Sequence, residues 1–152
     1  MYNANKENQE TVNRIRDELR ALVNGNYRNV DGQPVEVQQD NNGYDFLEID
    51  GVIYTENPDT DDENARELDE LDPFTLADYL NKNALDINYI TDAQKNYKAC
   101  RILIAYGGPN IYINTFNGKV ELFWWNEEAA AFLDDDVIEE IDAYQEEIFN
   151  CF

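Results

Sequence analysis

Residues 97–125 have the sequence YKACRILIAYGGPNIYINTFNGKVELFWW, and this stretch decides the fold. Its segments are rich in β-branched and aromatic residues, which predict strands, and Gly107-Gly108-Pro109 and Asn117-Gly118 predict the turns between them. Because these connections are short, neighbouring strands must be antiparallel. With one more strand upstream, the predicted strands are residues 85–90, 97–106, 110–115 and 119–125.

Helical segments lie on either side of these strands. Apolar residues spaced three and four apart predict helices over residues 8–23 and 134–149. Capping-box spacing from Thr75 to Asp78 predicts a short helix that ends near Asn83. The apolar face of the last helix consists of Val137, Ile141, Tyr144 and Ile148.

Residues 27–54 contain short apolar runs separated by turn residues. Asp31-Gly32, Asn41-Asn42-Gly43 and Asp50-Gly51 are sequences that favour tight hairpins. Residues 56–72 contain nine acidic residues and a single basic residue, Arg66. This composition predicts a solvated connection, with a helical turn near residues 65–71.

These elements together predict an α+β fold in which helices cover an antiparallel sheet and an acidic C-terminal helix lies across it. A chain of 152 residues fits one compact domain. We therefore expect a single domain over residues 1–152. Its predicted parts are a helix and short strands at 1–55, the acidic connection at 56–73, and a helix, sheet and C-terminal helix at 74–152.

The net charge restricts the partners that the protein can bind. There are 33 Asp and Glu against 11 Lys and Arg, which gives a formal charge of -22. Such a surface repels phosphate, so direct binding to nucleic acid or to an anionic membrane is excluded and a basic protein partner is favoured. With 43% hydrophobic and 12% aromatic residues, the chain can still form a core.

Missing residue types argue against an enzyme. The chain has no His and no Ser, so Ser-His and Cys-His nucleophiles and His-ligated metals cannot form. Cys100 and Cys151 make neither a disulfide framework nor a four-Cys zinc site, and we expect both to be reduced. We predict no catalytic residues, no cofactor and no metal.

Because no long apolar run occurs, we expect no signal peptide or membrane span and a cytoplasmic location.

The C-terminal helix is the main candidate site, because residues 120–152 contain eleven acids and no Lys or Arg. Like charges three and four apart destabilise a helix slightly, so the pattern favours an external role. One interpretation is a surface that imitates a phosphate backbone and occupies a basic groove; the other is a solubilising face. The predicted partner-binding residues here are Asp134, Asp135, Asp136, Glu139, Glu140, Asp142, Glu146 and Glu147.

The second acid run allows two functions. Asp59, Asp61, Asp62 and Glu63 form a second phosphate-like patch in one interpretation. In the other, Asp59, Asp61, Glu63 and Glu70 occupy positions 1, 3, 5 and 12 of a calcium loop, although Asn64 replaces its turn glycine.

Aromatic residues add a possible interface anchor. Strand alternation places at least half of the rings of Tyr106, Tyr112, Phe123, Trp124 and Trp125 in the core. One exposed tryptophan flanking the acidic surface would anchor an interface.

Residues 74–152 resemble small acidic proteins of phages and conjugative elements of Gram-positive gut bacteria. The similarity is carried by Tyr106–Thr115, by Gly118–Trp125 and by the acidic last helix. Some acidic proteins of such elements are anti-CRISPR or anti-restriction inhibitors. The resemblance implies an anti-defence protein of the DNA-mimic class and does not identify its target. We expect it to block the nucleic-acid groove of a host nuclease, with an RNA-guided Cas effector as the first candidate. The alternatives are an anti-restriction protein, an immunity protein against a nuclease toxin, and a carboxylate-based calcium or metal module.

Overall fold

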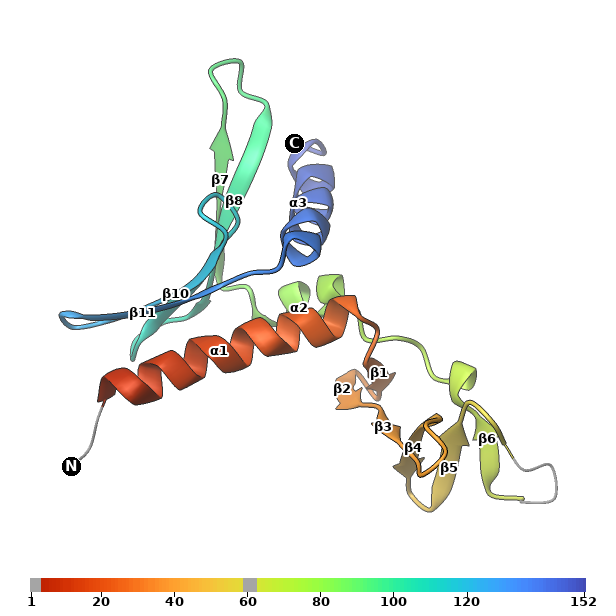
Figure 1. The fold of residues 1–152 in the computed structure, drawn as a ribbon. Coiled ribbons are helices and arrows are strands. Elements are labelled where there is room, and N and C mark those ends of the chain that lie inside the picture. Colours follow the sequence, from red (N-terminus) through yellow and green to blue (C-terminus); the bar gives the residue numbers. More distant parts are fainter. Residues whose placement is uncertain (1–3, 59–62) are drawn as a thin grey trace. The chain divides into compact units, whose positions relative to one another are not determined.

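The structure is a computed structural model that describes residues 4–58 and 63–152 (Figure 1). The chain forms two compact units, each described here by itself. The first contains Met1–Val23 and Leu76–Phe152, and the second contains Asn24–Thr75. The expectation of a single domain over residues 1–152 stays a prediction.

A five-stranded sheet forms the centre of the first unit. Its strands are β7 (Asp86–Thr91), β8 (Tyr97–Ala105), β9 (Asn110–Asn114), β10 (Lys119–Trp124) and β11 (Glu127–Phe132). They lie in the order β11-β10-β9-β8-β7, and every neighbouring pair is antiparallel. The predicted α+β fold with an antiparallel sheet is confirmed, and four of the five strands fall where the sequence placed them.

The fifth strand, β11, was not predicted. Its sequence, EEAAAF, consists mostly of residues that are depleted in strands. The two-residue turn after Trp124 returns the chain along β10, with Trp124 opposite Glu127. Ala129 and Ala131 are then buried, while Ala130 and Phe132 are exposed. Tertiary packing on one face therefore overrides the local preference.

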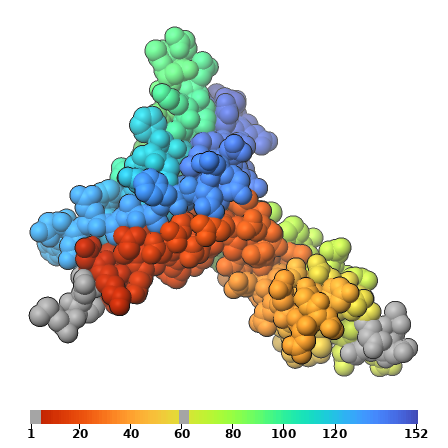
Figure 2. Space-filling view, in the orientation of Figure 1, coloured from red at the N-terminus to blue at the C-terminus, as the bar shows by residue number. Residues whose placement is uncertain are grey.

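Three helices complete this unit: α1 (Ala4–Val23), α2 (Leu76–Asn83) and α3 (Asp135–Phe149). The long helix α1 lies against the β10–β11 hairpin (Figures 1 and 2). Gln9 of α1 donates a hydrogen bond from Nε2 to the carbonyl oxygen of Ala130 at 2.8 Å. Helix α3 packs on β8, so the prediction that the last helix lies across the sheet is confirmed.

Apolar side chains of the helices and of one sheet face form the core. The predicted helical residues Val12, Ile15, Leu19, Leu22, Val137 and Ile141 are buried against strand residues that include Ile102, Ile113, Val120 and Leu122. The other two residues predicted on this face of α3, Tyr144 and Ile148, are less buried. Tyr144 is only half-buried and donates its hydroxyl to Asn81 Oδ1 at 2.7 Å, while Gln145 is 1% exposed.

Gly118 sets how closely α3 approaches the turn between β9 and β10. Its φ is +73°, which favours glycine. A Cβ atom at this position would lie 3.3 Å from Cδ1 of Ile138. The predicted Asn117-Gly118 turn therefore also serves the packing of the acidic helix.

The second unit consists of two small sheets. Its strands are β1 (Tyr27–Val30), β2 (Gln33–Glu36), β3 (Gln38–Gln39), β4 (Asp45–Ile49), β5 (Val52–Thr55) and β6 (Ala65–Glu67). The hairpin turns at Asp31-Gly32 and Asp50-Gly51 have positive φ at both residues, as two-residue hairpin turns favour. These predicted hairpins are confirmed.

The acidic connection at 56–73 contains more structure than a solvated linker. β6 pairs with β5 in parallel, and a 3₁₀ helix, η1 (Leu68–Glu70), follows it within the region where a helical turn was predicted. Leu68 is 1% exposed, so this part of the connection contributes a core residue.

Among the helices of the described residues, none has the length and apolar character needed to cross a membrane.

Candidate partner-binding surface

Helix α3 carries most of its acids on one face. Six of the eight predicted carboxylates are exposed: Asp135, Asp136, Glu139, Glu140, Glu146 and Glu147. At 3.6 residues per turn they fall within about 140° of the helix circumference, opposite the buried Val137 and Ile141. We call these six residues the acidic face. None of them forms an ion pair within the part of the chain that the structure describes.

The other two predicted residues are used inside the protein. Asp134, the residue before α3, accepts hydrogen bonds from Arg20 of α1, with Nη2–Oδ1 at 3.0 Å and Nε–Oδ2 at 2.5 Å. The Arg20 hydrogen bond lowers the pKa of Asp134 below its ordinary value of 3.8. Asp134 makes no side-chain cap to its own helix, so its carboxylate joins α1 to α3.

Asp142 fixes α3 to the sheet. Its Oδ1 accepts the hydroxyl of Tyr97 at 2.6 Å and the hydroxyl of Thr115 at 2.7 Å. Burial, followed by the hydrogen bond to Asp142, raises the pKa of Tyr97. Asp134 and Asp142 therefore have structural contacts inside the protein, and their part in partner binding stays a prediction.

The remaining arginines of α1 do not neutralise the acidic face. Arg14 pairs with Glu18 at 3.1 Å and Arg16 with Asp17 at 3.0 Å, both within α1.

The acids of α3 also repel one another. Partial burial, and secondly repulsion from Asp136, raises the pKa of Glu140. The last turn of α3 has no basic residue, so Glu146 and Glu147 also face the negative end of the helix dipole.

The acidic face has roughly the charge spacing of a nucleic-acid strand. Six charges over the 13 residues from Asp135 to Glu147 span about 18 Å, or one charge per ~3.6 Å of helix axis. One DNA strand carries one charge per about 3.4 Å. The face can therefore present a charge density like that of one DNA strand to a basic surface.

The second acid run is only partly within the described residues. Asp59, Asp61 and Asp62 lie outside them, and Glu63 is exposed in a turn. Glu70, the last predicted calcium ligand, pairs with Arg66 at 3.6 Å. No group of three or more acidic or thiol side chains is placed to hold a metal ion in residues 4–58 and 63–152. A second phosphate-like patch at 59–63 stays a prediction.

Aromatic residues form a second feature of the first unit, far along the sheet from α3. Trp125, in the β10–β11 turn, is 87% exposed, and Tyr106, in the β8–β9 turn, is 76% exposed. The expectation of one exposed tryptophan is confirmed. Its expected position was wrong, because Trp125 lies at the Asn110 end of β9 whereas Asp142 of α3 contacts Thr115 beyond the other end.

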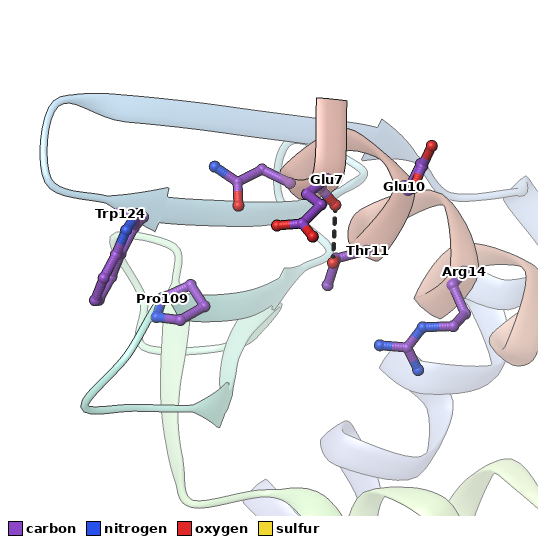
Figure 3. A pocket seen from close by; sticks show the side chains of 7 residues that line it. Glu7, Glu10, Thr11, Arg14, Pro109 and Trp124 are labelled. Atoms are coloured by element: carbon purple, nitrogen blue, oxygen red, sulfur yellow. Dashed lines mark hydrogen bonds between the residues drawn. The ribbon is translucent and has the colours of Figure 1, made fainter. Parts of the chain in front are cut away.

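A cleft of about 580 Å³ lies beside this turn (Figure 3). Trp124 and Pro109 line one side, and α1 lines the other with residues that include Glu7, Glu10 and Arg14. Sequence reasoning missed this cleft, because residues 7–14 and 109–124 come together only once α1 packs on β11.

Comparisons with protein-family models, curated proteins and solved structures find no match for this chain. The resemblance to anti-defence proteins therefore stays a prediction, and function is argued below from the surfaces alone.

Proposed function

We propose that the protein is a non-enzymatic inhibitor whose acidic face occupies the nucleic-acid-binding groove of a basic host nuclease. An RNA-guided Cas effector is the first target and a restriction enzyme the second, both in the bacterial cytoplasm. The observation that supports this proposal is the set of six exposed carboxylates on one side of α3 without an ion pair among the described residues.

The fold itself gives no reason for this arrangement. Acids three and four residues apart, such as Asp136 and Glu140, repel each other by a few tenths of a kcal/mol. Glu146 and Glu147 also oppose the helix dipole. A partner that presents Lys and Arg removes both penalties, and it releases its own counterions as it does on binding DNA.

The same chemistry would serve an anti-restriction protein or an immunity protein against a basic nuclease toxin. All three functions require the acidic face and differ only in the protein that it covers. Testing purified targets therefore distinguishes them, whereas mutation of the acidic face tests what they share.

The experiment compares two variants of equal charge. The first, E139Q/E140Q/E146Q/E147Q, removes four charges from the acidic face. The second, E36Q/E48Q/E67Q/D69N, removes four exposed charges from the second unit. DNA cleavage by RNA-guided effectors, restriction enzymes and nuclease toxins is measured with each protein present. We expect wild type and the second variant to inhibit one of these nucleases, and the first to need at least ~10-fold higher concentration.

Two results would contradict the proposal. One is equal inhibition by the two variants, which would mean that total charge and not the acidic face is responsible. The other is no inhibition of any nuclease by the wild-type protein. Because four glutamines relieve repulsion in α3, loss of inhibition by the first variant would not reflect unfolding, and thermal unfolding checks this.

A further inference from the structure

The two faces of the β10–β11 hairpin differ in burial. The cross-strand pairs Val120–Ala131 and Leu122–Ala129 are buried on the face that α1 covers. Alternate residues of both strands point to the other face and are exposed or half-buried: Lys119, Glu121, Phe123, Glu128, Ala130 and Phe132. We call these six residues the outer face. The water-facing side of an antiparallel sheet is usually polar, so two phenylalanines on this side indicate a contact surface.

The outer face has both a hollow and a projecting ring. The hollow has a volume of about 300 Å³, and Phe123, Glu128 and the small side chain of Ala130 are among the residues that line it. Phe132, two residues further along β11, does not line the hollow and is 71% exposed. A cavity of about 150 Å³ is enough to bind benzene, so the hollow has room for a phenylalanine ring.

The outer face has one basic end and one acidic end. Lys119 lies opposite Phe132 at one end of the hairpin, and its Nζ is 5.1 Å from the centre of that ring. Glu128 lies opposite Phe123, four residues away along each strand, which is about 13 Å. The projecting ring is therefore at the basic end, and the hollow extends to the acidic end.

Glu121, between the two ends, already has partners inside the chain. Its carboxylate accepts hydrogen bonds from Nδ2 of Asn114 at 3.0 Å and from Nδ2 of Asn117 at 2.9 Å. It also pairs with Arg101 at 3.6 Å. The middle of the outer face is therefore electrically compensated, and the two ends determine which partner fits.

We propose that two copies of the chain associate through their outer faces about a two-fold axis, with Phe132 of each copy in the hollow of the other. An axis that crosses the hairpin near Ala130 reverses the strand direction. It brings Phe132 over the hollow of the partner and Lys119 beside the partner's Glu128. A two-fold interface needs one surface that complements itself, and a ring, a hollow and opposite charges on the same hairpin meet that need.

The charges favour a second copy over other proteins. A basic partner would be repelled by Lys119 at one end of the outer face, and an acidic partner by Glu128 at the other and by the net charge of -22. A second copy satisfies both ends, because the two-fold axis places unlike charges together. The inference goes beyond the inhibitor proposal, since the outer face and the acidic face share no residue.

Salt should strengthen this association. Two copies of charge -22 repel each other at long range, and salt screens that repulsion, whereas burial of Phe132 persists. The acidic face, in contrast, should bind a basic nuclease less well as salt rises. Opposite salt dependences therefore distinguish the two proposals, and each can fail alone.

The test is sedimentation equilibrium of the full chain at about 0.05 M and about 0.5 M NaCl. We expect a monomer–dimer equilibrium with a Kd below about 100 µM at the higher salt, and weaker association at the lower salt. F132A and F152A form a matched pair, because each removes one exposed phenylalanine ring. F132A should weaken the dimer at least ~10-fold, and F152A should leave it within about 2-fold of the wild type.

Reversal of the two end charges tests the two-fold arrangement. K119E and E128K each place like charges together and should weaken the dimer at least ~3-fold at either salt, while K119E/E128K should recover the wild-type Kd within about 2-fold. E128K is the decisive variant, because it lowers the net charge and general repulsion alone would make it associate more tightly. Thermal unfolding checks that each variant is folded.

Three results would overturn the inference. The first is a wild-type protein that stays monomeric up to about 500 µM at the higher salt. The second is a dimer that F132A leaves unchanged or that F152A weakens as much. The third is tighter association of E128K, or no recovery in K119E/E128K.

Discussion

The guanidinium of Arg20 in α1 binds both carboxylate oxygens of Asp134, the residue that precedes α3. Residues 114 positions apart in the chain therefore join the first helix to the acidic last helix. This contact uses one of the four basic residues in the first 23, and among the described residues no basic side chain forms an ion pair with the acidic face.

The Arg20–Asp134 pair should make stability depend on pH. Because the folded-state pKa of Asp134 lies below 3.8, its contribution is complete above about pH 5 and disappears as the pH falls through the folded-state pKa. We expect D134N to lower the melting temperature at pH 7 and to have no effect at the lowest pH where the protein still folds. Calorimetry at both values measures this. An equal loss at both would show that the ion pair is not responsible.

Asp142 should contribute more to stability than any residue of the acidic face. D142A removes the carboxylate that accepts the hydroxyls of Tyr97 and Thr115, of which Thr115 keeps a hydrogen bond to the carbonyl oxygen of Cys100 at 3.2 Å, and we expect a loss of about 1–3 kcal/mol in the free energy of unfolding. D142N keeps an acceptor oxygen and should lose less. E139A, on the exposed face of the same helix, is the control and should change stability by under about 0.5 kcal/mol. Urea unfolding compares the three, and equal losses would contradict this role.

The two cysteines should differ sharply in reactivity. Both are free thiols; Cys100 is buried, and burial raises its pKa, while Cys151 is exposed. Thiolate is the reactive form, so a disulfide reagent should label Cys151 quickly and Cys100 only as the protein unfolds. C151A should then show no fast labelling. Rapid reaction of two thiols in the native wild-type protein would mean that the sheet opens readily.

Replacing Trp125 should not harm the fold. W125N places a residue that tolerates positive φ in the strained position, and the lost indole is mostly exposed. We expect the free energy of unfolding to rise by about 0.5–1 kcal/mol. The paired control, W124A, removes a half-buried ring and should destabilise the protein. A clear loss of stability in W125N would contradict the strain assigned to Trp125.

Much of the fold could be predicted from local sequence. Val12, Ile15, Leu19 and Leu22 have helical spacing and are buried, and the Asp31-Gly32 turn forms its hairpin. β11 could not be predicted, since its alanines become strand residues only when α1 covers them. The parallel pairing of β6 with the preceding strand β5 was also missed, because a strand of three residues, Ala65–Glu67, is too short to show an alternating pattern.

The site was predicted in part. Helical position correctly placed Asp135, Glu139 and Glu146 on the exposed side of α3. Position on one helix cannot show which acids find a partner on other elements, so the contacts of Asp134 and Asp142 were missed. The cleft beside Trp124 depends on three separate segments, and no local pattern indicates it.

Competition with DNA tests the central claim most directly. A fluorescent duplex is bound to an RNA-guided Cas effector or a restriction enzyme, and its anisotropy is followed as the protein is added at two salt concentrations. We predict that the wild-type protein displaces the duplex from at least one of these enzymes, less well at higher salt, and that E139Q/E140Q/E146Q/E147Q does so at least ~10-fold more weakly. Failure to displace DNA from any of them, or equal displacement by the quadruple variant, would contradict the account.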